Sequence, residues 1–195
     1  EESRSRLGRH VDVYQIHSAT AESGVLANDD VLNRLAEIRS EGVTIGLSTS
    51  GPDQASTIRE ALTVERDGTR LFSTVQSTWN LLEPSAGRAL AEAHEAGMGV
   101  MIKESVANGR LTDRDKETTA PLQQTFPDSN VDTIAIAAIL AQPWVDTVIC
   151  GAATRDQLES NIAALEVEAS RLADLPPMAE DPTDYWQRRA ELKWT

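Results

Sequence analysis

The stretch DDVLNRLAEIRSEGVTIGLS, residues 29–48, contains a helix signal followed by a strand signal. In residues 29–40, four large apolar residues recur at the spacing that places them on one face of a helix. Gly42 follows, as glycine commonly does where a helix ends. Residues 43–48 are mostly apolar, which is typical of a strand covered on both faces. The stretch therefore predicts a helix followed by a buried strand.

The same alternation recurs along the chain. The expected strands are residues 11–17, 43–48, 71–76, 98–103 and 145–150. The expected helices are residues 29–40, 53–65, 85–96, 132–141 and 154–165. Strands that alternate with helices are typical of parallel sheets with helical crossovers. The sequence therefore predicts an α/β fold with about five βα units and parallel strands.

Three segments fall outside this alternation. Residues 1–10 are expected to be the remnant of a preceding helix and turn. Residues 104–130 are rich in polar and turn-forming residues and predict a long loop after a strand, of the kind that often binds or covers a ligand. Residues 176–195 contain three prolines and a short tail helix. The aromatic residues of this tail are expected to cap their own domain, with contact to another subunit as the alternative: Tyr185, Trp186 and Trp194.

Composition narrows the function classes. The 195 residues include 18 Lys and Arg against 31 Asp and Glu, a net charge of −13, which argues against nucleic-acid and anionic membrane partners. No run approaches the ~20 apolar residues of a membrane-spanning helix. The single cysteine, Cys150, excludes an internal disulfide and fits a reducing, cytoplasmic environment. Its place in an apolar run predicts a buried, inert thiol. The sequence leaves the oligomeric state open.

Polar residues or glycine end, or directly follow, each expected strand. Parallel α/β folds place their chemistry at the carboxyl ends of strands. These positions are His17, Ser48, Gln76, Lys103 and Gly151. Each could be polar only because a loop begins there, but the set of five favours a site. The imidazole of His17 is suited to donate a hydrogen bond to a carbonyl and polarise it, and a structural histidine bonded to a neighbouring loop is the alternative.

The turn Gly151–Arg155 joins the last strand to a helix. Its small residues allow close backbone approach, the helix N-terminus favours anions, and Arg155 supplies a positive charge for phosphate. The alternative is a tight turn with a surface arginine. The sequence has no glycine-rich dinucleotide fingerprint, no phosphate-binding P-loop, no GxSxG and no Cys/His spacing for a metal.

The chain resembles the aldo-keto reductase family over nearly its whole length. The stretches that carry the resemblance are DVYQIHS (12–18), EGVTIGLSTSGP (41–52), VQSTWNLLEPS (75–85), GVMIKESVANGRL (99–111), AQPWVDTVICGAATRDQLESNIAAL (141–165) and YWQRRAELKW (185–194). The resemblance implies part of a (β/α)8 TIM barrel, residues 1–195, that starts just before the fourth strand. It also implies an NADP(H)-dependent oxidoreductase that interconverts carbonyls and alcohols by hydride transfer, with a small aldehyde or ketone as substrate.

The resemblance also assigns roles to residues. It implies that His17 orients and polarises the carbonyl, and that Ser48 and Gln76 hold the nicotinamide carboxamide. Lys103 stands where many members stack an aromatic ring under the nicotinamide. The residues implied to grip the adenosine phosphate and adenine are Gly151, Arg155, Gln157 and Asn161. Because Gly151 replaces a lysine that many members carry, recognition of the 2′-phosphate falls mainly to Arg155, and NAD(H) is the alternative cofactor.

The family's catalytic Asp, Tyr and Lys come from the first three βα units, and the sequence contains no match to them. We therefore expect a fragment that is inactive alone. A five-stranded open sheet also leaves two unpaired edges, so we expect marginal stability or dependence on a partner. Two alternatives stay open: a non-catalytic remnant that binds a dinucleotide or a partner protein, and a complete small flavodoxin-like protein with an anion site at Gly151–Arg155.

Overall fold

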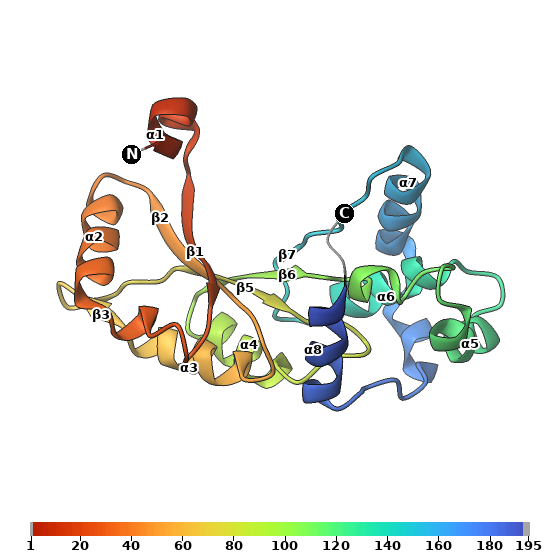
Figure 1. Cartoon of the computed structure of the whole chain (residues 1–195). Helices are drawn as coiled ribbons and strands as arrows, with labels where there is room; N and C mark the ends of the chain where they lie inside the picture. Colours follow the sequence, from red (N-terminus) through yellow and green to blue (C-terminus); the bar gives the residue numbers. More distant parts are fainter. Residues whose placement is uncertain (1, 193–195) are drawn as a thin grey trace. The chain divides into compact units, whose positions relative to one another are not determined.

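A computed structural model describes residues 2–192 of the chain (Figure 1). Its sheet has five strands: β1 (Val13–Ala19), β2 (Thr44–Thr49), β5 (Thr74–Thr78), β6 (Gly99–Lys103) and β7 (Thr147–Val148). Their order in the sheet follows the sequence, β1-β2-β5-β6-β7, and the pairs β1/β2, β2/β5 and β6/β7 are parallel. A flavodoxin-type sheet reverses its strand order at a switch point, so that alternative is wrong.

Helices connect these strands, as the alternation predicted. The α-helices are α1 (Glu2–Leu7), α2 (Asp29–Ser40), α3 (Gln54–Thr63), α4 (Gly87–Glu95), α5 (Lys116–Thr125), α6 (Val131–Leu140), α7 (Arg155–Ala163) and α8 (Pro182–Glu191). The 3₁₀ turns are η1 (Gly8–His10), η2 (Val25–Ala27), η3 (Ala107–Gly109), η4 (Ala164–Glu166) and η5 (Ala169–Asp174). A short hairpin, β3 (Glu65–Arg66) and β4 (Thr69–Arg70), turns at Asp67-Gly68. None of the described helices is long and apolar enough to cross a membrane.

Three segments differ from the sequence-based expectations. Strand β5 begins and ends later than the expected 71–76, so Gln76 lies in its middle and not at its end. The expected loop at 104–130 contains α5, which begins after Asp115, whose carboxylate accepts the backbone N–H of Thr118 at 3.0 Å. Pro121 lies inside this helix and obscures its pattern in the sequence. The last strand is shorter than the expected 145–150, because β7 pairs with β6 only over two residues.

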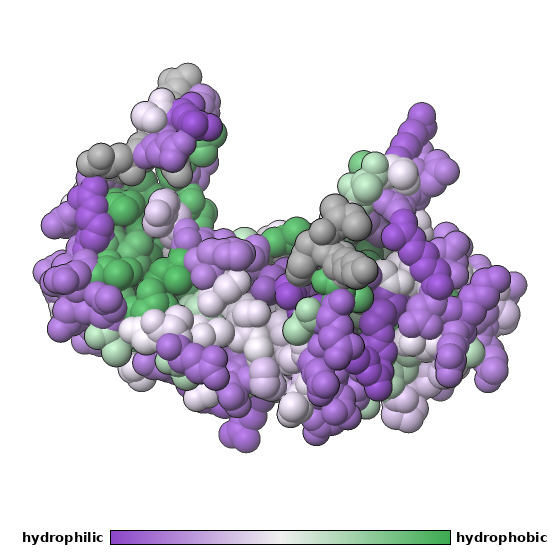
Figure 2. Space-filling model, viewed as in Figure 1, coloured by the Kyte–Doolittle hydropathy of each residue, from purple (hydrophilic) through white to green (hydrophobic). Residues whose placement is uncertain are grey.

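The chain divides into two compact units, which we describe separately. Unit 1 comprises residues 2–77 and 88–100 of the described chain. Its core contains residues from β2, α2, α3 and β5, namely Ile45, Leu47, Leu32, Leu35, Ile58 and Val75. The burial of nearly every residue of β2 confirms the strand covered on both faces. Strand β1 is more open, since Val13 and Tyr14 are 44% and 40% exposed, and Figure 2 shows apolar surface on this part of unit 1.

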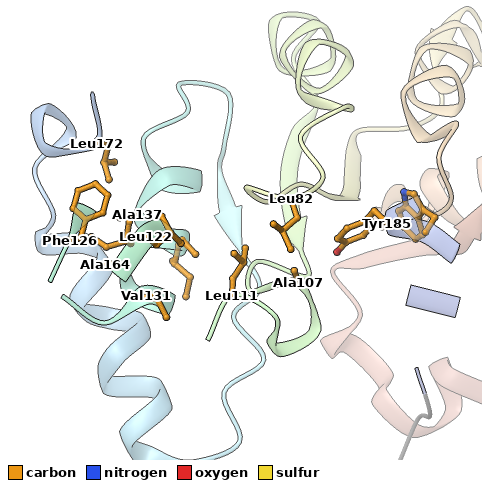
Figure 3. Packing of buried hydrophobic residues seen from close by; sticks show 14 residues of the cluster. Leu82, Ala107, Leu111, Leu122, Phe126, Val131, Ala137, Ala164, Leu172 and Tyr185 are labelled. Carbon is orange, nitrogen blue, oxygen red and sulfur yellow. The ribbon is translucent and has the colours of Figure 1, made fainter. Parts of the chain in front are cut away.

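Unit 2 comprises residues 78–87 and 101–192 of the described chain. Its core is built around α6, which is buried over most of its length (Figure 3). Tyr185 and Trp186 of α8 pack into this core and are 2% and 7% exposed. This confirms that these two aromatic residues dock on their own domain. Trp194 lies outside the described residues.

Candidate functional site

Three of the predicted site residues lie on neighbouring strands of unit 1. Ser48 at the end of β2 is in register with Gln76 of β5. His17 of β1 follows Ile16, whose partner in β2 is Leu47, the residue before Ser48. His17, Ser48 and Gln76 therefore stand at one level near the carboxyl ends of three adjacent strands, one or two residues before each strand ends.

The backbone beside His17 is held by Ser48. The register between β1 and β2 shifts after Ile16, and Ser18 adopts a φ of +54°, a left-handed conformation that is uncommon for serine. The Ser48 hydroxyl is 3% exposed and accepts the backbone N–H of Ser18 at 2.8 Å. This bond fixes the strand end that carries His17 and leaves the hydroxyl proton of Ser48 free to be donated.

The side chains of His17 and Gln76 are not engaged within the described part of the chain. The imidazole of His17 is exposed, and it has no hydrogen bond to any described residue, which does not support a structural histidine bonded to a loop. Gln76 is half-buried and its amide is equally unengaged among residues 2–192. Both groups are therefore available to a ligand.

A polar layer lies one step back along the same strands. Gln15, Gly46 and Thr74 are in register on β1, β2 and β5. The amide of Gln15 lies 3.5 Å from the hydroxyl of Thr74. A Cβ on Gly46 would lie 2.1 Å from that same hydroxyl oxygen, so the glycine leaves room for both neighbours. The layer supports the level of His17 from beneath.

The opposite side of β2 carries a buried chain of hydroxyl and amide groups. The hydroxyls of Thr49 and Ser77 are 3.0 Å apart, and Ser77 donates to the Gln54 carboxamide oxygen at 2.7 Å. All three residues are fully buried. This chain ties β2, β5 and the first residue of α3 together and commits Thr49 to the interior.

In unit 2, a cavity of about 390 Å³ opens beside the turn after β7. Its size lies within the ~300–1,000 Å³ of small-molecule sites. Three predicted residues line it, Gly151, Gln157 and Asn161, whereas Arg155 does not. The Asn161 amide makes no hydrogen bond within the described residues, so it can bind a ligand in this cavity.

The turn into α7 is held by a capping box. The hydroxyl of Thr154 accepts the backbone N–H of Gln157 at 3.2 Å. The Gln157 carboxamide oxygen in return accepts the backbone N–H groups of Ala153 at 2.8 Å and Thr154 at 3.2 Å. Gln157 therefore shapes the turn with its oxygen and occupies two of the donors expected for an anion.

The charges around the cavity differ from the sequence-based expectation. Arg155 has a side chain 88% exposed, and its guanidinium pairs with Glu159 at 2.7 Å. The cation on the cavity lining is Arg114, accompanied by the carboxylates of Asp113 and Asp132. Sequence reasoning missed Arg114, because the expectation of a binding loop indicated the segment but not which of its residues faces the cavity.

Lys103 and Cys150 also differ from what the sequence predicted for them. Lys103, the last residue of β6, is half-buried and does not line the cavity. Burial lowers the pKa of its ammonium group, an effect that the nearby Glu104 carboxylate opposes and Arg189 adds to. Cys150 is half-buried and lines the cavity, so the expectation of a fully buried thiol is wrong. The physical reason is that β7 ends at Val148, before the cysteine.

No group of three or more His, Cys, Asp or Glu side chains suited to a metal ion occurs within residues 2–192. The donors that the two units offer are instead an imidazole, amides, a hydroxyl and a guanidinium. Such groups recognise a polar organic ligand that carries a carboxamide or a phosphate.

Comparisons with known proteins agree with the fold. A family model described as the aldo/keto reductase family matches residues 1–173. The curated protein "Uncharacterized oxidoreductase YqkF" of Bacillus subtilis (strain 168) is 24% identical over 190 residues, which cover 85% of this chain and 57% of that protein.

Solved structures show the same likeness. The holo form of aldo-keto reductase AKR11C1 from Bacillus halodurans superposes with a TM-score of 0.66 at 22% identity and covers 96% of this chain and 64% of that one. Its apo form gives a TM-score of 0.64 at 21% identity, covering 95% and 68%. This chain thus spans a little over half of the curated relative and about two thirds of the solved ones, and its fold is part of a (β/α)8 barrel.

Proposed function

Because the chain belongs to the aldo/keto reductase family, we propose that it supplies the cofactor-binding and carbonyl-polarising part of an NADP(H)-dependent oxidoreductase that interconverts small carbonyls and alcohols. The observation that carries the proposal is the row of His17, Ser48 and Gln76 near the carboxyl ends of three adjacent strands. A bound nicotinamide supplies or accepts the hydride. The proposal extends to NADP(H) rather than NAD(H) and to a cytoplasmic protein.

The residues of unit 1 act on the reacting end. The exposed imidazole of His17 donates a hydrogen bond to the substrate carbonyl and so increases its electrophilic character. Ser48 and Gln76 bind the nicotinamide carboxamide, the first with its remaining hydroxyl proton and the second with its unengaged amide. Thr49 takes no part, since its hydroxyl is bound to Ser77 in the interior.

The residues of unit 2 act on the adenosine end. Gly151 and Asn161 line the cavity beside the turn after β7, and the size of this cavity fits a nucleoside portion. Gln157 keeps the turn in shape through its capping box. Arg155, assigned from the sequence, and Arg114, on the cavity lining, are the two cations that bind the cofactor phosphates. Lys103 is assigned to the cofactor from the family resemblance alone.

Hydride transfer to a carbonyl produces an alkoxide that needs a proton. A positioned acid contributes about 10²–10⁴-fold to the rate. The sequence contains no match to the family's Asp, Tyr and Lys, and His17 alone is a poor sole proton source. We therefore expect this chain by itself to bind the dinucleotide without reducing a carbonyl.

The test is a calorimetric titration of the chain with NADPH. Saturable binding is expected, and Gln76→Ala should weaken it by about 3–10-fold, the loss of roughly one net hydrogen bond. Gln187→Ala, on the exposed side of α8, is the matched control and should leave the affinity unchanged. Absence of binding to both NADPH and NADH would rule the proposal out. Carbonyl-dependent oxidation of NADPH by this chain alone would contradict the expected lack of turnover.

A further inference from the structure

We propose that α8 prepares the cofactor cavity for an anionic ligand, because its Arg189 neutralises and orients Glu104, a carboxylate on the cavity wall. Arg189 is thus a positioning residue for dinucleotide binding. The inference rests on the proposed function, since a dinucleotide carries several negative charges. It concerns unit 2 alone, from which the cavity, Glu104 and α8 all come.

Glu104 occupies an unfavourable place for a carboxylate. It follows β6 directly, lines the same cavity as Gly151 and Asn161, and its side chain is only 9% exposed. Its φ of +56° is left-handed, which non-glycine residues adopt rarely. A carboxylate removed from water in this way requires partners, and a bare one would repel phosphate from the cavity.

The partners of Glu104 come largely from α8. Arg189 donates to one carboxylate oxygen from Nε at 2.9 Å and from Nη2 at 2.7 Å. The hydroxyl of Tyr185, which Figure 3 shows directed away from α8 toward the loop at Ala107, lies 3.4 Å from the other oxygen. Burial raises the pKa of Tyr185, so this hydroxyl remains a donor at neutral pH. Asn108 approaches the same oxygen at 3.4 Å.

The backbone of Glu104 is fixed by the same network. The Asn80 amide donates to the Glu104 carbonyl oxygen and to the Tyr185 hydroxyl, each at 3.0 Å. Arg189 in turn lies over the ring of Trp186, with its guanidinium carbon 5.6 Å from the ring centroid. Because each member is held by another, α8 sets both the charge and the direction of the Glu104 side chain.

A separate set of contacts anchors the tail, which argues that Arg189 does more than dock it. Arg110 makes two hydrogen bonds to the Glu180 carboxylate, at 2.6 and 3.0 Å, and Arg188 reaches one oxygen of Glu180 at 3.1 Å. The backbone N–H of Glu180 also donates to the Leu82 carbonyl at 2.8 Å. Arg188 pairs with Glu180 and makes no hydrogen bond or ion pair with Glu104 within the described chain, so it offers a matched control on the same helix.

The Glu104–Arg189 ion pair matters for anion binding because carboxylates outnumber cations on the cavity lining. Asp113 and Asp132 also line the cavity, against the single cation Arg114 among the lining residues that the structure describes. With a net charge of −13, the chain as a whole already opposes an anion. Releasing the Glu104 carboxylate from Arg189 would add one more uncompensated charge at the wall.

The experiment is a double-mutant cycle on the full chain, with NADPH as the titrant. Arg189→Gln should weaken binding by about tenfold or more at low salt, whereas Arg188→Gln should leave it unchanged. The double variant Glu104→Gln/Arg189→Gln should bind within about threefold of wild type, because it removes the negative charge of Glu104 together with the arginine that neutralises it. The loss in Arg189→Gln should also shrink at high ionic strength.

The outcomes separate the charge role from a packing role. If Arg189 only docks the tail, the double variant stays as weak as Arg189→Gln, and the inference is wrong. Wild-type affinity in Arg189→Gln overturns it as well. If Arg189→Gln does not fold, Arg189→Lys keeps the positive charge and must bind nearly as wild type does. Should the wild-type chain bind neither NADPH nor NADH, the proposed function fails and this inference with it; binding with no effect of Arg189 defeats the inference alone.

Discussion

At Gly46, in the layer beneath the candidate site, there is no room for a side chain. A Cβ there would lie 2.1 Å from the Thr74 hydroxyl, 3.0 Å from the Thr74 carbonyl oxygen and 3.1 Å from Gln15. Gly46→Ala should therefore lower the free energy of unfolding by about 1–3 kcal/mol, the usual effect of overpacking. Chemical denaturation measures it.

Gly99→Ala is the matched control for this substitution. It meets the same neighbour, since its Cβ would lie 3.4 Å from the Thr74 methyl carbon, an ordinary contact. We expect stability within about 0.5 kcal/mol of wild type. Equal stability of the Gly46 and Gly99 variants would contradict the close approach of Thr74 to Gly46.

The two candidate arginines make different predictions for cofactor choice. Arg114 lines the cavity of unit 2, whereas Arg155 is paired with Glu159 outside the lining. Arg114→Gln should therefore weaken NADPH binding by about tenfold or more, the loss of a charge-assisted hydrogen bond. Arg155→Gln should weaken NADPH binding only about twofold, because Arg155 lies outside the cavity lining. Titrations with NADPH and NADH measure both, and a larger effect of Arg155→Gln would restore the assignment made from the sequence.

The sequence was enough to predict which residues lie near the ends of the strands. It was not enough to predict the path of the loops. His17, Ser48 and Gln76 could be placed from the sequence, because the carboxyl ends of parallel strands meet at one edge whatever the loops do. Arg114 and Cys150 could not, since their access to the cavity depends on α5 and on where β7 stops. The Glu104–Arg189 pair joins residues 85 positions apart, and no local pattern indicates it.

At the scale of elements, α7 depends on its capping box. Thr154→Ala removes the acceptor for the Gln157 N–H, and such losses cost about 0.5–2 kcal/mol. We expect faster amide hydrogen exchange across Arg155–Ala163, with smaller changes elsewhere, because this helix has no buried residue to hold it. Thr183→Ala, in the first turn of α8, is the control. Unchanged exchange in α7 would show that the box contributes nothing.

The bounds of a helix could be predicted accurately where capping residues mark its ends in the sequence. The bounds of α2 match the prediction at both ends, because Asn28 caps its start and Gly42 follows its end with a φ of +90°. Helix α5 was missed because Pro121 and a polar composition hide a helix that the Asp115 cap and tertiary packing stabilise. Propensity is a weak prior in such segments, and packing decides.

At the scale of the whole molecule, the strand order could be predicted from the sequence. The exposure of the sheet edge could be predicted only in part. Alternation of strands and helices restricts the sheet to a few topologies, and the observed sequential order is one of them. The expected open edge agrees with the exposure of Val13 and Tyr14 on β1. The division into two units left no mark in the composition, since contacts between distant segments define it.

The stability of the whole chain should fall steeply in acid. The hydrogen bonds from Arg110 lower the pKa of Glu180, and those from Thr118 lower the pKa of Asp115. In the unfolded chain these carboxyls return to about 4. Their stabilising contribution is therefore complete above that pH and is lost as the pH falls through the lower folded-state values. Denaturation curves between pH 7 and pH 2.5 measure the loss.

The variant Glu180→Gln tests how much of the loss of stability in acid comes from the ion pairs of Glu180. Because Glu180 binds both Arg110 and Arg188 and is about one-fifth exposed, its replacement should cost about 1 kcal/mol at pH 7. As the pH falls through the lowered pKa of Glu180, the wild-type carboxyl becomes protonated as well, so the two proteins should converge and the variant's curve should be flatter. Glu191→Gln, at the end of α8, should keep the wild-type slope. A constant difference between Glu180→Gln and wild type at every pH would mean that the ion pairs of Glu180 do not stabilise the fold.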